Sequence, residues 1–129
     1  MKILLVDDED QFRESVMRQL TNRGYTVYDV STGEEAIELI SQQNIDVTVL
    51  DMRMPGISGE VTLNEIKRIA PLTEVIMLTG HATVNAAMKV INMGAFDYIT
   101  KPVRLNELIN KMEDAYKKKE LKEKKLNNR

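Results

Sequence analysis

Asp7, Asp8 and Asp51 are the residues whose types and spacing point most directly to chemistry, because they come directly after short apolar segments. If the ends of those segments meet, three carboxylates repel one another, and one must take up a proton unless a cation is bound. Oxygen ligands without histidine or cysteine favour Mg²⁺, which keeps several waters and uses one or two carboxylates together with a phosphate oxygen. The sequence therefore predicts a Mg²⁺ site at these residues.

Thr79 and Lys101 follow two further apolar segments. An ammonium group suited to phosphate and a neutral hydroxyl donor, placed beside Mg²⁺, favour a phosphoryl group at the centre of the site. Taken alone, Asp7 and Asp8 are typical of a helix N-terminus, Asp51 of a turn and Lys101 of a solvated surface. Taken together, the five residues indicate phosphoryl transfer to a carboxylate.

Five short β-branched or aliphatic segments predict the strands that must position these residues. Three of them, residues 3–6, 47–50 and 75–78, are continuously apolar, as expected for strands that helices cover on both faces. Residues 25–30 are more mixed and predict an edge strand, and residues 96–99 predict the fifth strand.

Segments with helical spacing of apolar residues lie between and after these strands. They are residues 12–20, 36–40, 63–70, 84–91 and 105–116. Strands that alternate with helices through short connections predict a parallel sheet with right-handed crossovers, which is a doubly wound α/β domain. Ligands of such sheets bind outside the carboxyl ends of the strands, where the five polar residues are expected to meet.

The boundaries of the predicted helices carry their own signals. Thr32, followed by Gly33-Glu34-Glu35, predicts a capping box at the start of the second helix. Gly24 and Gly94 stand where the first and fourth helices would end on a residue in the left-handed conformation.

The composition limits the classes of function. With 129 residues, of which 43% are hydrophobic and 29% charged, the chain is suited to one ordinary soluble domain. The absence of cysteine excludes a disulfide framework, a thiolate zinc site and a cysteine nucleophile. His81 is the single histidine and is expected to be an exposed loop residue, which disfavours multi-histidine metal sites and a Ser-His-Asp triad.

The two ends of the chain differ in charge. The apolar start is interrupted by acidic residues 7–10, so it is too short for a signal peptide or a membrane span, and we expect a cytoplasmic location. Residues 113–129 are basic overall, whereas the remainder is acidic. Because the apolar stripe ends at Tyr116, we expect a domain at residues 1–116 and a charged helical extension or linker at residues 117–129.

Four motifs together give the sequence a strong resemblance to receiver domains of two-component response regulators. The motifs are residues 6–9 (VDDE), 51–59 (DMRMPGISG), 78–80 (LTG) and 97–102 (DYITKP). The resemblance covers about residues 1–116 and implies a flavodoxin-like, CheY-like sheet of five parallel strands in the order 2-1-3-4-5.

The resemblance implies a role for each residue of the site. Asp51 resembles the phosphoacceptor, which takes a phosphoryl group from a phosphohistidine of a sensor histidine kinase or a phosphotransfer protein. Asp7 and Asp8 resemble the acidic pair that binds Mg²⁺ together with Asp51 and the backbone carbonyl of Arg53. Lys101 resembles the lysine that pairs with a phosphoryl oxygen, and its bond to the following proline is typically cis in this family.

Thr79 and Tyr98 resemble the switch pair of the family. The resemblance implies that phosphorylation biases a two-state packing and alters the surface made by the fourth helix, the fifth strand and the fifth helix. Residues 80–84 and 94–98 are most similar to receivers that precede an ATPase domain in enhancer-binding (sigma-54) transcription activators. An output domain, a downstream partner and a homodimer are all compatible with such a receiver.

Two alternatives remain open from the residues. An aspartyl phosphatase on a similar sheet would want a second aspartate two residues after the nucleophile, where this chain has Arg53. A phosphorylation-independent binding module is the other alternative, although residues 7–10 would repel a flavin phosphate. A receiver catalyses only its own phosphorylation and dephosphorylation, so we expect no independent enzyme activity. The basic tail is short and does not predict nucleic-acid binding.

Overall fold

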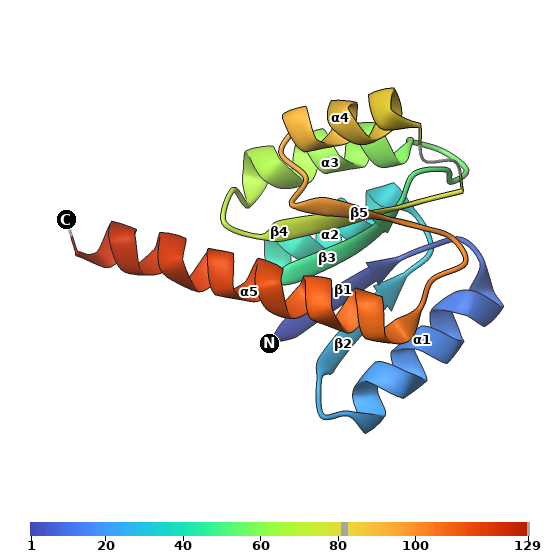
Figure 1. Cartoon of the computed structure of the whole chain (residues 1–129), viewed down its shortest axis with the longest axis horizontal. Coiled ribbons are helices and arrows are strands. Elements are labelled where there is room, and N and C mark those ends of the chain that lie inside the picture. The colour runs from blue at the N-terminus through green and yellow to red at the C-terminus, as the bar shows by residue number, and fades with distance from the viewer. Residues whose placement is uncertain (81–82, 129) are drawn as a thin grey trace.

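The computed structural model describes residues 1–80 and 83–128 and shows one parallel sheet flanked by helices (Figure 1). His81, expected to be an exposed loop residue, lies outside the described residues. The strands are β1 (Lys2–Val6), β2 (Thr26–Val30), β3 (Val47–Asp51), β4 (Glu74–Thr79) and β5 (Asp97–Thr100). The helices are α1 (Asp10–Asn22), α2 (Gly33–Gln42), α3 (Gly59–Ile69), α4 (Val84–Asn92) and α5 (Leu105–Asn127).

The strand order is β2-β1-β3-β4-β5, and each neighbouring pair is parallel. The expected doubly wound fold and its order are therefore confirmed. Val6 of β1 lies opposite Leu50 of β3, so the residues that follow them emerge side by side. Thr79 of β4 lies opposite Thr100 of β5, which brings Lys101 to the same edge of the sheet.

The helices cover the two faces of the sheet in separate layers (Figure 1). Ile3 and Leu5 of β1 pack in the cluster formed with α1 and α5. The alternate residues Leu4 and Val6 pack in the cluster formed with α2, α3 and α4. Because successive side chains of a strand point to opposite faces, the continuously apolar strands fill both cores, as their sequences predict.

The predicted helix boundaries are observed. The Thr32 side chain accepts a hydrogen bond from the backbone N–H of Glu35 at 3.1 Å and caps α2. Gly24 and Gly94 have φ values of 93° and 108°, a region that side chains disfavour, and they follow the ends of α1 and α4.

Helix α5 continues without a break from Leu105 to Asn127 and passes beyond the amino ends of the strands (Figure 1). Its extension is held by ion pairs, since Lys122 Nζ lies 2.8 Å from Glu74 Oε1 and Lys119 Nζ lies 2.9 Å from Asp46 Oδ1. Residues 117–129, expected to form a charged helical extension or a linker, are helical in the structure as far as Asn127. Among the described residues, no helix has both the length and the apolarity needed to span a bilayer.

Candidate phosphoryl and metal site

Asp7, Asp8 and Asp51 form an acidic cluster at the carboxyl edge of the sheet. One oxygen atom from each carboxylate lies within 4.8 Å of the others. Asp7 and Asp51 are buried, with exposed fractions of 1% and 6%, whereas Asp8 is exposed to solvent. The cluster is thus open on one side and closed on the other.

The charge of this cluster is not balanced by the protein alone. Burial and repulsion by Asp7 raise the pKa of Asp51 to about 6, although Lys101 acts in the opposite direction. An ordinary aspartate has a pKa near 3.8, so the ionised form of Asp51 is disfavoured in the folded protein. A bound cation would remove this penalty.

Lys101 places its ammonium group among three carboxylates at the carboxyl edge. Its Nζ lies 3.1 Å from Asp7 Oδ2, 3.1 Å from Glu9 Oε1 and 3.6 Å from Asp51 Oδ2. Burial opposes its charge, but the hydrogen bond to Asp7 and the nearby Asp51 raise the pKa of Lys101 above its ordinary value. The ammonium group therefore stays charged next to the Asp51 carboxylate.

Glu9 is a member of the site that sequence reasoning missed. It stands in the 6–9 motif, but an exposed acid at the start of a helix is typical of dipole stabilisation. Its contact with Lys101 joins residues 92 positions apart in the sequence. Only the motif itself could have indicated it.

Thr79 and Arg53 line the same hollow of about 520 Å³ as Asp8, Asp51 and Lys101. The backbone N–H of Arg53 points to Asp51 Oδ1 at 3.4 Å. The backbone N–H of Lys101 donates to the Thr79 carbonyl at 2.8 Å, so two strand ends are tied together beside the hollow. The peptide bond between Lys101 and Pro102 is cis, as the resemblance implies.

Tyr98 does not line the hollow of the acidic cluster, whereas Thr79 does. The two residues line one narrow apolar cleft beneath α4, together with Met77, Ala87 and Val90 among others. Lys111 Nζ lies 5.8 Å from the centre of the Tyr98 ring. The structure therefore places Tyr98 next to Thr79 but outside the acidic hollow.

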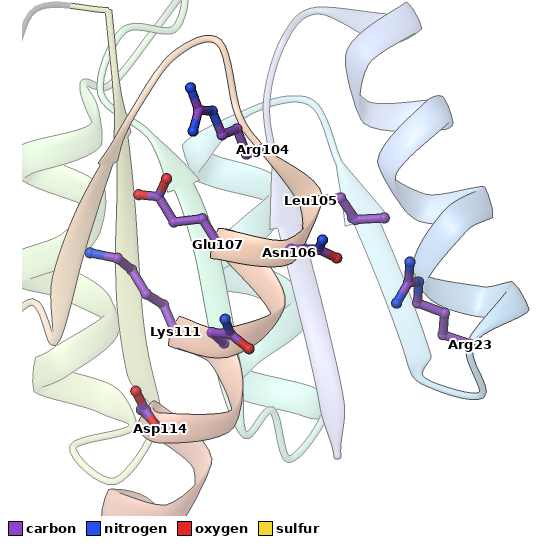
Figure 2. A pocket seen from close by; sticks show the side chains of 8 residues that line it. Arg23, Arg104, Leu105, Asn106, Glu107, Lys111 and Asp114 are labelled. Carbon is purple, nitrogen blue, oxygen red and sulfur yellow. The ribbon is translucent and has the colours of Figure 1, made fainter.

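A separate hollow of about 730 Å³ lies along α5 and the end of α1 (Figure 2). Arg23, Arg104 and Lys111 line it together with the acids Glu107 and Asp114. In Figure 2 these side chains point in different directions and share no common centre. The mixed charges and the divergent directions do not define a ligand site.

The donor set at the carboxyl edge fits Mg²⁺. The cluster offers carboxylate oxygens, which this ion prefers, and its exposed side leaves room for the waters that Mg²⁺ retains. Burial and, second, repulsion by Asp7 raise the pKa of Asp51, so a positive charge placed beside it would favour its ionised form. The acid cluster and the lysine lie at the carboxyl edge, which is where doubly wound sheets bind their ligands.

The chain belongs to the family of response regulator receiver domains, whose model matches residues 3–113. Among curated relatives, Regulatory protein VanR from Enterococcus faecium is 43% identical over 108 residues, which cover 84% of this chain and 46% of VanR. DNA-binding transcriptional regulator NtrC from Escherichia coli (strain K12) is 34% identical over 113 residues, or 88% of this chain and 24% of NtrC. The chain thus spans less than half the length of these relatives.

Solved structures agree with this assignment. A response regulator receiver domain protein from Clostridium thermocellum has a TM-score of 0.87 and 36% identity, covering 93% of this chain and 97% of that one. NtrX from Brucella abortus, solved in complex with ADP, has a TM-score of 0.91 and 31% identity over 99% of this chain and 30% of that one. The expected likeness to receivers of enhancer-binding (sigma-54) regulators is confirmed by NtrC and NtrX.

Proposed function

We propose that Asp51 accepts a phosphoryl group from a phosphohistidine of a sensor histidine kinase or a phosphotransfer protein. A carboxylate oxygen of Asp51 forms a bond to phosphorus while the bond from phosphorus to the imidazole nitrogen breaks, which gives an acyl phosphate. The single observation that carries this proposal is the juxtaposition of a buried Asp51, two further carboxylates within 4.8 Å and the Lys101 ammonium at 3.6 Å.

In this proposal Asp7, Asp8, Asp51 and the carbonyl of Arg53 hold Mg²⁺. When bound, the ion supplies positive charge that offsets both the acidic cluster and the transferred phosphoryl group. Lys101 supplies a second positive charge, because its Nζ can pair with a phosphoryl oxygen added to Asp51. The exposed side of the cluster is the side from which a donor can approach.

The proposal assigns the response to Thr79 and Tyr98. A hydroxyl at Thr79 can move toward the phosphoryl oxygens, and this movement changes the cleft that it shares with Tyr98. A new position of Tyr98 then alters the surface of α4, β5 and α5. That surface would control an output domain, a partner or a second copy, as the longer regulators among the relatives suggest.

The proposed receiver acts in the cytoplasm and turns over no substrate other than its own acyl phosphate. This distinguishes it from an aspartyl phosphatase, which would release phosphate from an added phosphomonoester. It also distinguishes it from a module that binds without phosphorylation.

Intact mass measured before and after incubation with acetyl phosphate and Mg²⁺ tests the proposal. We expect the wild type to gain one phosphoryl group, Asp51→Asn to gain none and Asp46→Asn, a control at the opposite end of the sheet, to behave as the wild type. Size-exclusion chromatography of the same samples reports whether phosphorylation changes the oligomeric state. Labelling of Asp51→Asn, or no labelling of the wild type, would contradict the assignment.

A further inference from the structure

Arg13 makes contacts that the sequence does not predict and that the proposed chemistry does not use. It lies one turn into α1, and its side chain is only 12% exposed. Nη1 donates to the backbone carbonyl of Asp7 at 2.7 Å, and Nε donates to Asp29 Oδ2 at 2.8 Å. Nη2 pairs with Asp10 Oδ1 at 2.9 Å. One guanidinium thus connects the carboxyl ends of β1 and β2 with the first residue of α1.

The contact with the Asp7 carbonyl matters because that carbonyl belongs to the planar peptide unit that joins Asp7 to Asp8. The Asp7 carboxylate is also held, since Oδ1 accepts from the N–H of Glu9 at 2.9 Å and Oδ2 from Lys101 at 3.1 Å. The backbone and the side chain of Asp7 are therefore both fixed.

Asp8 is in a different position. Its side chain is exposed, and within the described part of the chain its carboxylate accepts no hydrogen bond. The position of its Cβ, and with it the rotamers that can reach the other two carboxylates, is set by the backbone that carries it. That backbone is the peptide unit whose carbonyl Arg13 holds.

We propose that Arg13 is a positioning residue for Mg²⁺ binding, which fixes the peptide unit from which Asp7 and Asp8 project without itself touching the ion. This inference rests on the proposed metal site. Arginine suits the task because its planar group donates in several fixed directions and remains charged, whereas lysine offers a single point charge. Residues that orient metal ligands in this way commonly alter metal affinity by about 10- to 100-fold.

Titration of the metal-free protein with Mg²⁺ alone, followed by calorimetry, tests the inference. In Arg13→Gln we expect the dissociation constant for Mg²⁺ to rise about 10-fold. Arg18→Gln removes an exposed arginine from the same helix and should bind Mg²⁺ as the wild type does. In acetyl phosphate reactions, the Mg²⁺ concentration for half-maximal rate should rise by the same factor in Arg13→Gln, while the rate at saturating Mg²⁺ stays within about 2-fold.

Two further variants keep the inference testable if Arg13→Gln does not fold. Arg13→Lys keeps the charge but cannot reach all three partners, so its affinity should remain below that of the wild type. Asp29→Asn keeps Arg13 and weakens only its Nε contact, so its dissociation constant should rise by a smaller factor, about 3-fold.

The outcomes separate this inference from the proposed function. If the wild type binds no Mg²⁺, the metal site itself is wrong. If the wild type binds Mg²⁺ and every folded variant among Arg13→Gln, Arg13→Lys and Asp29→Asn binds it as tightly as Arg18→Gln, the metal site stands and the role of Arg13 is overturned. A saturating rate that falls in Arg13→Gln while its Mg²⁺ affinity is unchanged would likewise overturn it.

Discussion

The two edges of the sheet differ in the sign of the charge that predominates around their buried groups. At the carboxyl edge one ammonium group, that of Lys101, lies among several carboxylates. At the amino edge one fully buried carboxylate, that of Glu74, lies among several lysines. Lys122 and Lys118 approach it at 2.8 and 3.8 Å, and burial together with these two lysines lowers the pKa of Lys67 beside them.

The two edges also differ in what can offset their excess charge. Lys118 and Lys122 are partly exposed, so their excess positive charge is also solvated by water. The acids of the carboxyl edge include two buried carboxylates, and the raised pKa of Asp51, caused by burial and by Asp7, shows the cost. The amino edge therefore meets its buried acid with lysines of the chain itself, although Glu74 Oε2 accepts no hydrogen bond from the described residues. The carboxyl edge, in contrast, gathers acids at a place where a cation could bind.

The largest expected effect is on the stability gained when Mg²⁺ is added, which should depend on the acids of the carboxyl edge and not on those of the amino edge. At a free concentration 100 times the dissociation constant, a single site stabilises the folded state by about 2.7 kcal/mol. We expect urea unfolding of the wild type to show this gain and Asp8→Asn to lose most of it. Asp46→Asn removes an acid from the amino edge and should keep the gain, whereas an equal gain in Asp8→Asn would contradict the predicted site.

Glu74→Gln should have the next largest effect. The substitution keeps the shape of the side chain but leaves Lys118 and Lys122 without their acid. Breaking a buried ion pair costs about 3–5 kcal/mol, and because both lysines can turn to water we expect a loss of about 2 kcal/mol in the free energy of unfolding. Glu65→Gln, at an exposed pair with Arg68, should leave the free energy of unfolding unchanged within the error of the measurement. Equal stability of the two variants would contradict this account.

The carboxyl edge could largely be predicted from the sequence, and the amino edge could not. The apolar segments at residues 3–6 and 47–50 predict buried parallel strands, and the topology of such strands then brings Asp7 and Asp51 to one edge. Glu74 meets Lys122 across 48 positions. No periodicity links a buried acid at the start of a strand to the part of a helix that continues beyond its apolar stripe.

The contacts of Arg13 at the carboxyl edge could not be predicted from the sequence either. An arginine on an amphipathic helix is typical of the solvent-facing side. Its burial arises only because α1 packs next to the ends of β1 and β2, where the carbonyl of Asp7 and the carboxylate of Asp29 are within reach. Such contacts depend on three elements at once, so they follow from the fold and not from any one segment.

Asp51→Asn should stabilise the metal-free protein. The folded state raises the pKa of Asp51 from 3.8 to about 6 by burial and by repulsion from Asp7, so the ionised carboxylate destabilises it above pH 6. The full shift, which already includes the attraction of Lys101, corresponds to about 3 kcal/mol. Screening by solvent at the open edge reduces the expected difference between the variants to about 1 kcal/mol at pH 7.5.

The pH dependence has a definite sign. As pH falls from 7 through 6 toward 4, Asp51 takes up its proton in the folded state before it does in the unfolded state. The wild type is relieved of its penalty, and the stability gap to Asp51→Asn should close over this range. Urea unfolding in metal-free buffer measures the gap, with Asp46→Asn as the matched control. A stability gap that widens toward pH 4 would show that folding does not raise the pKa of Asp51.

Lys119→Met should have the smallest effect, and it tests whether the α5 extension is held by more than Glu74. Lys119 is 14% exposed and pairs with Asp46 at 2.9 Å and with Glu123. Methionine keeps the packing of the aliphatic stem, so only the ion pairs are lost, at about 0.5 kcal/mol. Lys125→Met, at an exposed position, should change nothing measurable. Because the contact joins α5 to the loop before β3, hydrogen exchange after Tyr116 should quicken in Lys119→Met alone; equal exchange in both variants would leave Glu74 as the main anchor of the extension.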